Sequence, residues 1–213
     1  MNYLVFDCVL NKSYITLVKG EEVINKIIES DEKNYHSVYL VSEIQKIMQE
    51  NALNFKELDF ISTDIGPASF TGIRTGLCIA KTLASEANLP LVPISAVEIL
   101  SYALENKLCT VFEDARRGNY IYYNPETETE PKLILKSEAV ELAKNCESEI
   151  ICDTNCYNYF LGEGIETINY EAEDFPIGEI LARLAYKKFE SGKDFPYTSV
   201  KPLYVQTPPV FQK

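Results

Sequence analysis

The order in which strand-like and helix-like hydrophobic periods follow one another most constrains the fold of this chain. Three successive segments alternate apolar and polar side chains or run apolar, which predicts strands joined as hairpins. Helical and strand periods then alternate. The predicted elements are strands at 2–9, 13–19 and 21–29, a helix at 37–50, a strand at 58–65, a helix at about 71–87, a strand at 91–94 and a helix from Ser95 to about 104. This order predicts an α/β fold with a mixed sheet flanked by helices.

The same order of elements recurs in the second half. The predicted elements there are strands at 108–113, 119–124 and 132–136, a helix from Ser137 to about 145, a strand at 149–152, loop-like sequence through 170, and a helix opened by Pro176. We therefore predict two related lobes. Residues 1–100 form the N-terminal lobe, and residues 101–213 form a smaller C-terminal lobe with an extended tail.

Charge and composition exclude several classes of function. The net charge is −12 and only four residues are arginines, so we expect no direct grip on nucleic acid. The sequence has no run of about 18 apolar residues, and we expect no membrane contact. The six cysteines are scattered and the first residues lack a basic head, which predicts reduced thiols and a cytoplasmic location.

Catalytic and metal-binding constellations are not apparent in the sequence. The single histidine, His36, has Leu40 four residues later, where a helical metal pair needs a second ligand. Asp7 ends the first strand, but no glycine follows before Gly20, and a loop that wraps phosphate needs glycine. We predict no catalytic residue, no metal and no cofactor for this chain, and a buried structural role for Asp7.

The segment from Gly66 to Leu77 joins a predicted strand to a helix through a Gly-Pro turn and a hydroxyl cap. Free N–H groups at the start of a helix can bind an anion. The segment is not a Walker A loop, because Ile73-Arg74 follows Gly72. A structural turn is the alternative.

A stripe of small residues runs along the helix after this turn: Gly72, Gly76, Ala80 and Ala84. A glycine inside a helix costs about 1 kcal/mol relative to alanine, so a close approach of another backbone should compensate. The stripe either packs on the chain's own sheet or forms a seam with another subunit.

Two arginines, Arg116 and Arg117, lie next to a predicted turn between Asp114 and Gly118. Adjacent guanidinium groups can hold an anion or a carboxylate of a partner. A solvated hairpin is the alternative interpretation.

Together these segments resemble the TsaB (YeaZ) family. Its Gly-Pro-Gly-Ser-Phe-Thr-Gly-Leu-Arg motif is similar to the stretch formed by Gly66, Pro67, Ala68, Ser69, Phe70, Thr71, Gly72, Ile73 and Arg74. A second family motif is similar to the stretch from Asp114 through Arg116 and Arg117 to Gly118. Ala68 replaces the second glycine of the family, and Cys8 stands where threonine is usual. The resemblance is dense over about 1–123.

The resemblance implies an actin/Hsp70-like (ASKHA) two-lobed fold with a reduced second lobe. It implies a non-catalytic, activating subunit of the complex that forms N6-threonylcarbamoyladenosine at position 37 of tRNAs reading codons that begin with A. The partners would be the catalytic paralogue TsaD and the ATPase TsaE, with ATP and metal on those subunits, a homodimer when alone, and tRNA contacted only indirectly. The implied interface residues are His36, Leu40, Ile44, Ile47, Gly72, Ile73, Gly76, Leu77 and Ala80. An ATP- or metal-dependent enzyme of the same fold, either a kinase or peptidase-like, is the alternative.

Overall fold

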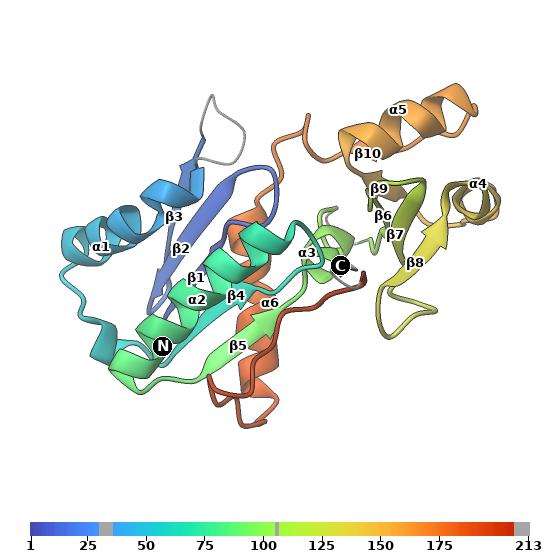
Figure 1. Cartoon of the computed structure of the whole chain (residues 1–213). Helices are drawn as coiled ribbons and strands as arrows, with labels where there is room; N and C mark the ends of the chain where they lie inside the picture. Colours follow the sequence, from blue (N-terminus) through green and yellow to red (C-terminus); the bar gives the residue numbers. More distant parts are fainter. Residues whose placement is uncertain (30–35, 105–106, 207–213) are drawn as a thin grey trace, which may run out of the picture. The chain divides into compact units, whose positions relative to one another are not determined.

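A computed structural model describes residues 1–29, 36–104 and 107–206 of the chain (Figure 1). The chain forms two compact units. The first unit comprises Met1–Ile99 and Pro176–Pro202, and the second comprises Leu100–Phe175 and Leu203–Lys213. The boundary near Ile99 falls within the helix in which the sequence predicts the join between the lobes.

The first unit is built on a five-stranded sheet of order β3-β2-β1-β4-β5. Its strands are β1 (Asn2–Asp7), β2 (Ser13–Lys19), β3 (Glu22–Ile28), β4 (Phe60–Asp64) and β5 (Leu91–Ile94). The first three form antiparallel hairpins, whereas β4 runs parallel to β1 and β5 parallel to β4. The predicted strands of this half are confirmed. Because β1 and β4 are adjacent and parallel, Asp7 and Asp64 end neighbouring strands.

One face of this sheet is covered by two helices, which lie in front of it in Figure 1. These are α1 (Leu40–Glu50), preceded by the 3-10 turn η1 (His36–Tyr39), and α2 (Phe70–Ala87), with the short η2 (Phe55–Glu57) between them. Their buried side chains pack against apolar residues of β1, β2, β4 and β5. The helical period of residues 37–50 would also place Val38 and Val41 on this apolar face, but their side chains are 64% and 44% exposed.

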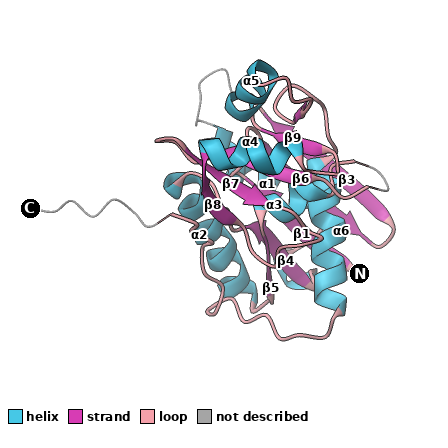
Figure 2. Ribbon diagram, turned by 90° about the vertical axis from the view of Figure 1, so that its right-hand side faces the viewer, coloured by secondary structure: helices cyan, strands magenta, loops and turns pink. Residues whose placement is uncertain are grey.

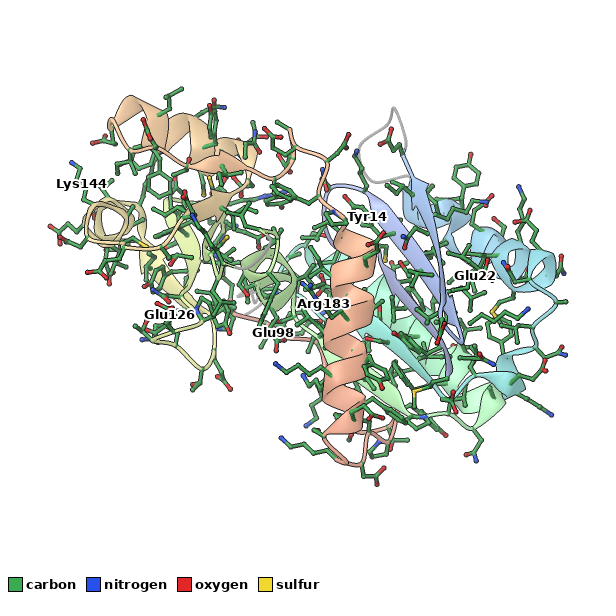
Figure 3. All side chains as sticks on the ribbon, turned by 180° about the vertical axis from the view of Figure 1, so that it is seen from behind. Tyr14, Glu22, Glu98, Glu126, Lys144 and Arg183 are labelled. Carbon is green, nitrogen blue, oxygen red and sulfur yellow. The ribbon has the colours of Figure 1, made fainter. Side chains whose placement is uncertain are left out.

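The other face is covered by α6 (Ile177–Glu190), which lies in front of the sheet when the molecule is seen from behind (Figure 3). The Phe189 ring stacks on Phe60 with centroids 4.5 Å apart, and Lys188 Nζ donates a hydrogen bond to the Pro93 carbonyl at 2.7 Å. The predicted assignment of residues 101–213 to the second lobe is therefore wrong for 176–202. The buried stripe of α6 fits the uncovered side of the first sheet, and sequence order does not reveal that return.

The second unit repeats this strand order in a sheet of order β10-β9-β6-β7-β8. Its strands are β6 (Thr110–Asp114), β7 (Asn119–Tyr123), β8 (Lys132–Leu135), β9 (Ile150–Cys152) and β10 (Ile168–Asn169). The β6–β7–β8 hairpins are antiparallel and β9 is parallel to β6. A further helix, α3 (Ala96–Ser101), begins after Ser95, whose hydroxyl accepts a hydrogen bond from the Glu98 N–H at 3.2 Å as predicted for a helix cap.

Two short helices, α4 (Lys136–Lys144) and α5 (Thr154–Gly162), pack against one face of the second sheet (Figure 2). The sequence predicts α4, although its N-cap is Leu135 rather than Ser137. It does not predict α5, because Thr154, Asn155 and Asn158 are weak helix formers. The signal that could have found α5 is Asp153, whose carboxylate accepts a hydrogen bond from the Cys156 N–H at 2.8 Å.

Candidate partner-binding surface and strand-end acids

The turn between β4 and α2 holds most of the motif residues that the sequence singles out. Gly66 has a φ of 98°, and its N–H donates to Asp64 Oδ1 at 2.7 Å. Ser69 caps α2 by accepting a hydrogen bond from the Gly72 N–H at 3.2 Å. Ala68 is not among the described residues with positive φ, so alanine at the family's glycine position requires no left-handed backbone. Pro67 is buried, whereas Phe70 is half-exposed and Thr71 is exposed.

The small-residue stripe of α2 packs on the chain's own strand ends. A Cβ atom added at Gly72 would lie 3.3 Å from the Cys8 carbonyl oxygen. One added at Gly76 would lie 3.0 Å from Cys8 Sγ and 3.6 Å from Thr63 Oγ1. Of the two interpretations left open by the sequence, packing on the own sheet accounts for both glycines.

Burial corrects the residues predicted for the partner interface. Six of the predicted side chains are at most 5% exposed and lie in the chain's own core: Leu40, Ile44, Ile47, Ile73, Leu77 and Ala80. Gly76 is also buried, Gly72 is half-buried, and the side chain of His36 lies outside the described residues. An apolar helical stripe has the same sequence pattern whether the chain's own sheet or a partner covers it. The pattern therefore does not show that these side chains face the chain's own sheet.

The same elements expose a different set of side chains. The 3-10 turn η1 lies next to α2, and Val38, Tyr39 and Val41 are 64%, 56% and 44% exposed. On α2 the exposed residues follow helical spacing, as expected for one face. We use the name η1–α2 surface for exposed residues of η1, of the first turn of α1, which follows η1 directly, and of α2: Val38, Tyr39, Val41, Thr71, Arg74 and Cys78. Cys78 is the exposed one of the six cysteines, and the Arg74 guanidinium lies 5.8 Å from the centroid of the Phe70 ring.

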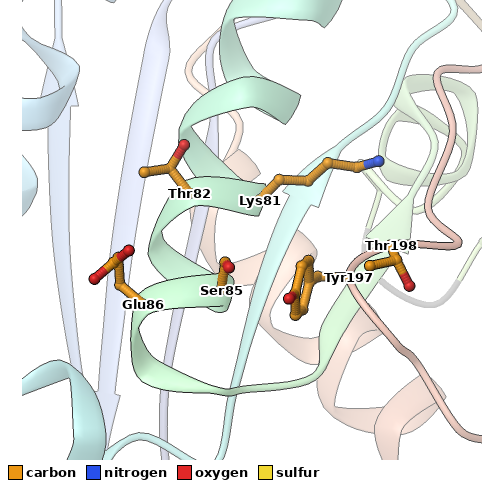
Figure 4. Close-up of a pocket in the computed structure, with 6 residues that line it drawn as sticks. All are labelled: Lys81, Thr82, Ser85, Glu86, Tyr197 and Thr198. Atoms are coloured by element: carbon orange, nitrogen blue, oxygen red, sulfur yellow. The ribbon is translucent and has the colours of Figure 1, made fainter.

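An open groove of about 500 Å³ lies further along α2, between its C-terminal half and residues 197–198 (Figure 4). Its lining residues are Lys81, Thr82, Ser85, Glu86, Tyr197 and Thr198. These side chains are mostly polar. The groove extends the exposed face of α2 beyond Cys78.

The strand-end acid Asp7 is fully buried. Its Oδ1 accepts a hydrogen bond from the Val9 N–H at 2.7 Å, and its Oδ2 accepts one from the Leu10 N–H at 3.3 Å. Burial raises the pKa of Asp7 to about 7, against the opposing effect of these hydrogen bonds and of the neighbouring Asp64 side chain. Burial and the two nearby carboxyl groups also raise the pKa of the Cys8 thiol. The prediction that Asp7 is buried is confirmed.

The β6–β7 turn of the second unit carries the two predicted arginines. Arg116, Arg117 and Gly118 have φ angles of 65°, 54° and 77°, so three successive residues adopt the left-handed conformation. For a residue other than glycine this conformation costs about 1 kcal/mol or more. Asp114 supports the turn, because its Oδ1 accepts a hydrogen bond from the Arg116 N–H at 2.8 Å. Both arginine side chains are exposed.

The described residues contain neither a metal-binding cluster nor a membrane-spanning helix. In residues 1–29, 36–104 and 107–206, no group of three or more histidine, cysteine, aspartate or glutamate side chains is arranged to hold a metal ion. Within the same ranges, no helix has the length and apolarity needed to cross a membrane.

Comparison with known proteins gives consistent results. A family profile described as TsaD, tRNA N6-adenosine threonylcarbamoyltransferase, matches residues 22–146. The "tRNA threonylcarbamoyladenosine biosynthesis protein TsaB" of Bacillus subtilis is 32% identical over 49% of this chain and 46% of that protein. The protein of the same name from Escherichia coli is 23% identical over 84% of both chains. The E. coli protein excepted, this chain spans about half the length of such relatives.

Solved structures match over nearly the whole chain. A Pseudomonas aeruginosa protein described as similar to the peptidase YeaZ superimposes with a TM-score of 0.76 at 16% identity, over 96% of this chain and 99% of that one. Two sheets of the same order with flanking helices define an actin/Hsp70-like (ASKHA) α/β protein, as the resemblance implies. More specifically, the chain belongs to the TsaB/YeaZ family, within the wider family that the TsaD profile describes.

Proposed function

We propose that this chain is a non-catalytic, activating subunit of the complex that forms N6-threonylcarbamoyladenosine in tRNA, and that it pairs with TsaD. The η1–α2 surface carries the proposal: an exposed apolar cluster, Val38, Tyr39 and Val41, lies beside a helix of the first unit. The names of the relatives supply the pathway. Exposed apolar side chains gathered on neighbouring elements are typical of a protein contact.

The closed strand end supports a role without chemistry of its own. Hydrogen bonds from Val9 and Leu10 occupy Asp7, so the loop after β1 folds back on its own acid. The same loop lies on the first turns of α2, where Gly72 and Gly76 face Cys8. A phosphate at the start of α2 would compete with the chain's own backbone for that space.

The contact would activate TsaD by favouring its competent conformation, since a partner shifts an equilibrium toward the state it binds better. ATP, metal and the ATPase TsaE would act with the partner subunits in the cytoplasm. When the chain is alone, the same surface would pair two copies. Homodimer and heterodimer would then compete.

The alternative is an enzyme of the same fold, and the peptidase-like description of a structural neighbour favours it. Hydrolysis of a peptide, or ATP turnover, by the purified chain alone would support the enzyme and contradict the proposed role. Measurement of both activities with and without TsaD separates the two functions.

A pair of matched substitutions tests the surface. Val41→Glu places a charge on the η1–α2 surface and should weaken TsaD binding by about tenfold or more, because burying an unpaired carboxylate is unfavourable. Val23→Glu is the control, since Val23 is similarly exposed, at 50%, but lies on the edge strand β3. Isothermal titration measures both affinities, and a tRNA modification assay measures the consequence.

Cys78 offers an independent measurement. It is the exposed cysteine of the chain and lies on the same surface, so maleimide should label it rapidly in the free chain and slowly in the TsaD complex. Cys78→Ser reports the background from the other cysteines. Equal labelling with and without TsaD, together with unaltered binding by Val41→Glu, would show that TsaD does not bind here.

A further inference from the structure

The β6–β7 turn uses arginine at two positions that suit arginine poorly. Left-handed φ angles favour glycine or asparagine, yet Arg116 and Arg117 both adopt them. Arginine is also scarce, because only four of the 20 Lys and Arg residues are arginines and two of these four are here. Lysine or asparagine would solvate an exposed turn as well. A strained backbone in a surface turn is typical of a site with a function.

The turn is held by contacts on several sides. Asp114 Oδ1 accepts a hydrogen bond from the Arg116 N–H, and Asn155 Nδ2 donates to Asp114 Oδ2 at 3.1 Å. The carbonyl of Ala115 accepts from Gln206 Nε2 at 2.8 Å. These bonds fix the backbone from which both guanidinium groups project, so little conformational freedom of the turn is lost when a ligand binds.

A third cation lies next to the turn. The Lys136 N–H donates to the Gly118 carbonyl at 3.0 Å, which places the start of α4 against the turn. Lys136 Nζ lies 3.6 Å from the centroid of the half-exposed Tyr159 ring. Within the described residues neither Arg116 nor Arg117 forms an ion pair. Two unpaired guanidinium groups, an ammonium group and an aromatic ring therefore gather in this part of the second unit.

We propose that Arg116 and Arg117 bind the phosphate backbone of RNA, with Lys136 and Tyr159 beside them. The proposal rests on the proposed function, in which the RNA is tRNA, and it replaces the sequence expectation that tRNA is contacted only indirectly. Guanidinium forks match phosphate oxygens, and arginine does so better than lysine. RNA fits better than an acidic protein segment because the patch combines cations with an aromatic ring, as RNA-binding surfaces do.

The net charge of −12 explains why the cations are concentrated at one place. An acidic protein repels RNA at long range, so an approach is tolerated only where local cations offset that repulsion. The contact would therefore add to the RNA affinity of a more basic partner, and this chain alone would bind RNA weakly.

The test uses the complex of this chain with its TsaD and a fluorescent anticodon stem-loop RNA, with affinity measured by anisotropy between about 50 and 200 mM salt. The double variant Arg116→Asn, Arg117→Asn removes both guanidinium groups and keeps residues that tolerate left-handed φ, so the turn should fold at least as well. We expect about tenfold weaker RNA binding and, because two phosphate contacts are lost, a salt slope smaller by about 2. Arg183→Ala removes an exposed arginine of α6 and should bind RNA like the wild type.

A charge-preserving variant separates fork geometry from charge. Arg116→Lys with Arg117→Lys should keep the salt slope and still lose part of the affinity. RNA affinity and salt slope that stay unchanged in the asparagine variant would overturn the inference. So would loss of TsaD binding by that variant, which would assign the arginines to carboxylates of a protein.

Failure of the proposed function has a different outcome. If the wild-type chain does not bind TsaD at all, the proposed function is wrong. RNA binding by the chain alone, compared between wild type and the asparagine variant, then decides the inference: weaker binding by the variant supports it and equal binding contradicts it.

Discussion

The two units share a strand order but close the end of their first strand differently. In the first unit, helices cover both faces of the sheet and Asp7 is fully buried at the end of β1. In the second, α4 and α5 pack against one face, and the corresponding Asp114 at the end of β6 is half-exposed. Both acids face a tyrosine of the next strand, Tyr14 or Tyr120. One topology therefore supports either a closed strand end or an open, charged turn.

This difference shows where each unit can interact. In the first unit, backbone N–H groups of the following loop contact the acid at the end of β1, and a helical surface remains exposed. The second leaves its turn exposed and places arginines on it. The proposed protein contact and the proposed RNA contact thus belong to different units, so substitutions in one unit can test one contact without disturbing the other.

The largest expected effect is on the pH dependence of stability. Burial raises the pKa of Asp7 to about 7 from an ordinary value of 3.8, so the folded chain keeps a proton that the unfolded chain loses at lower pH. The free energy of unfolding should therefore fall between about pH 4 and 7, by up to about 1.4 kcal/mol per pH unit, and then level off. Asp7→Asn should flatten this fall, because an amide does not ionise. Urea denaturation across this pH range measures it.

Asp114→Asn is the matched control in the second unit, where the acid is half-exposed. Its pH profile is measured beside that of Asp7→Asn under the same conditions. Equal flattening by the two variants would show that the strand ends do not differ as described.

The next effect concerns the contact of α6 with the first sheet. A Cβ at Gly178 would overlap Thr16 Oγ1 and lie 3.3 Å from Asn25 Oδ1, so Gly178→Ala should destabilise the chain by about 2 kcal/mol. Gly162→Ala, at the end of α5 with open space around it, should be neutral or stabilising by up to about 1 kcal/mol. Thermal unfolding of both variants checks the pair. A harmless Gly178→Ala would mean that α6 does not pack on this sheet.

The smallest expected effect is on stability and distinguishes the β4–α2 turn, which contains Ala68, from the β6–β7 turn, which contains Arg117. Ala68 does not need positive φ, so Ala68→Gly should lower the free energy of unfolding by about 0.5–1 kcal/mol. Glycine increases the conformational entropy of the unfolded chain. Arg117→Asn should have the opposite sign, because Arg117 has a φ of 54° that asparagine tolerates better. Chemical denaturation resolves differences of this size. Destabilisation by both substitutions would remove the argument that arginine is strained in the second turn.

Local pattern predicted most of the fold. Alternation and helical period predicted the strands of both units, and the repeat of their order predicted two related lobes. Two features depended on the rest of the molecule. The sequence shows the apolar stripe that contains Leu40 and Ile44, but it does not show what packs against that stripe. The chain's own sheet and a partner protein would both require the same apolar face. The place of α6 was also hidden, because its contacts with Phe60 and Pro93 join residues about a hundred positions apart.

The candidate sites followed the same division. The sequence singles out Arg116 and Arg117 because they are adjacent and lie beside a predicted turn, but their left-handed backbone is visible only in the structure. Val38 and Val41 are apolar and fit the helical period of a buried face, so the sequence alone does not indicate that they are exposed. Exposure depends on which neighbours cover a side chain, and sequence spacing does not contain that information.

The split of the first unit along the chain has a consequence for its synthesis. Residues 1–99 leave the ribosome long before 176–202, which supply α6. During that interval residues 100–175 of the second unit are synthesised, and one side of the first sheet has no helix to cover it. In the nascent chain, the first sheet therefore stays uncovered on one side while residues 100–175 are translated, and α6 completes the first unit when it emerges.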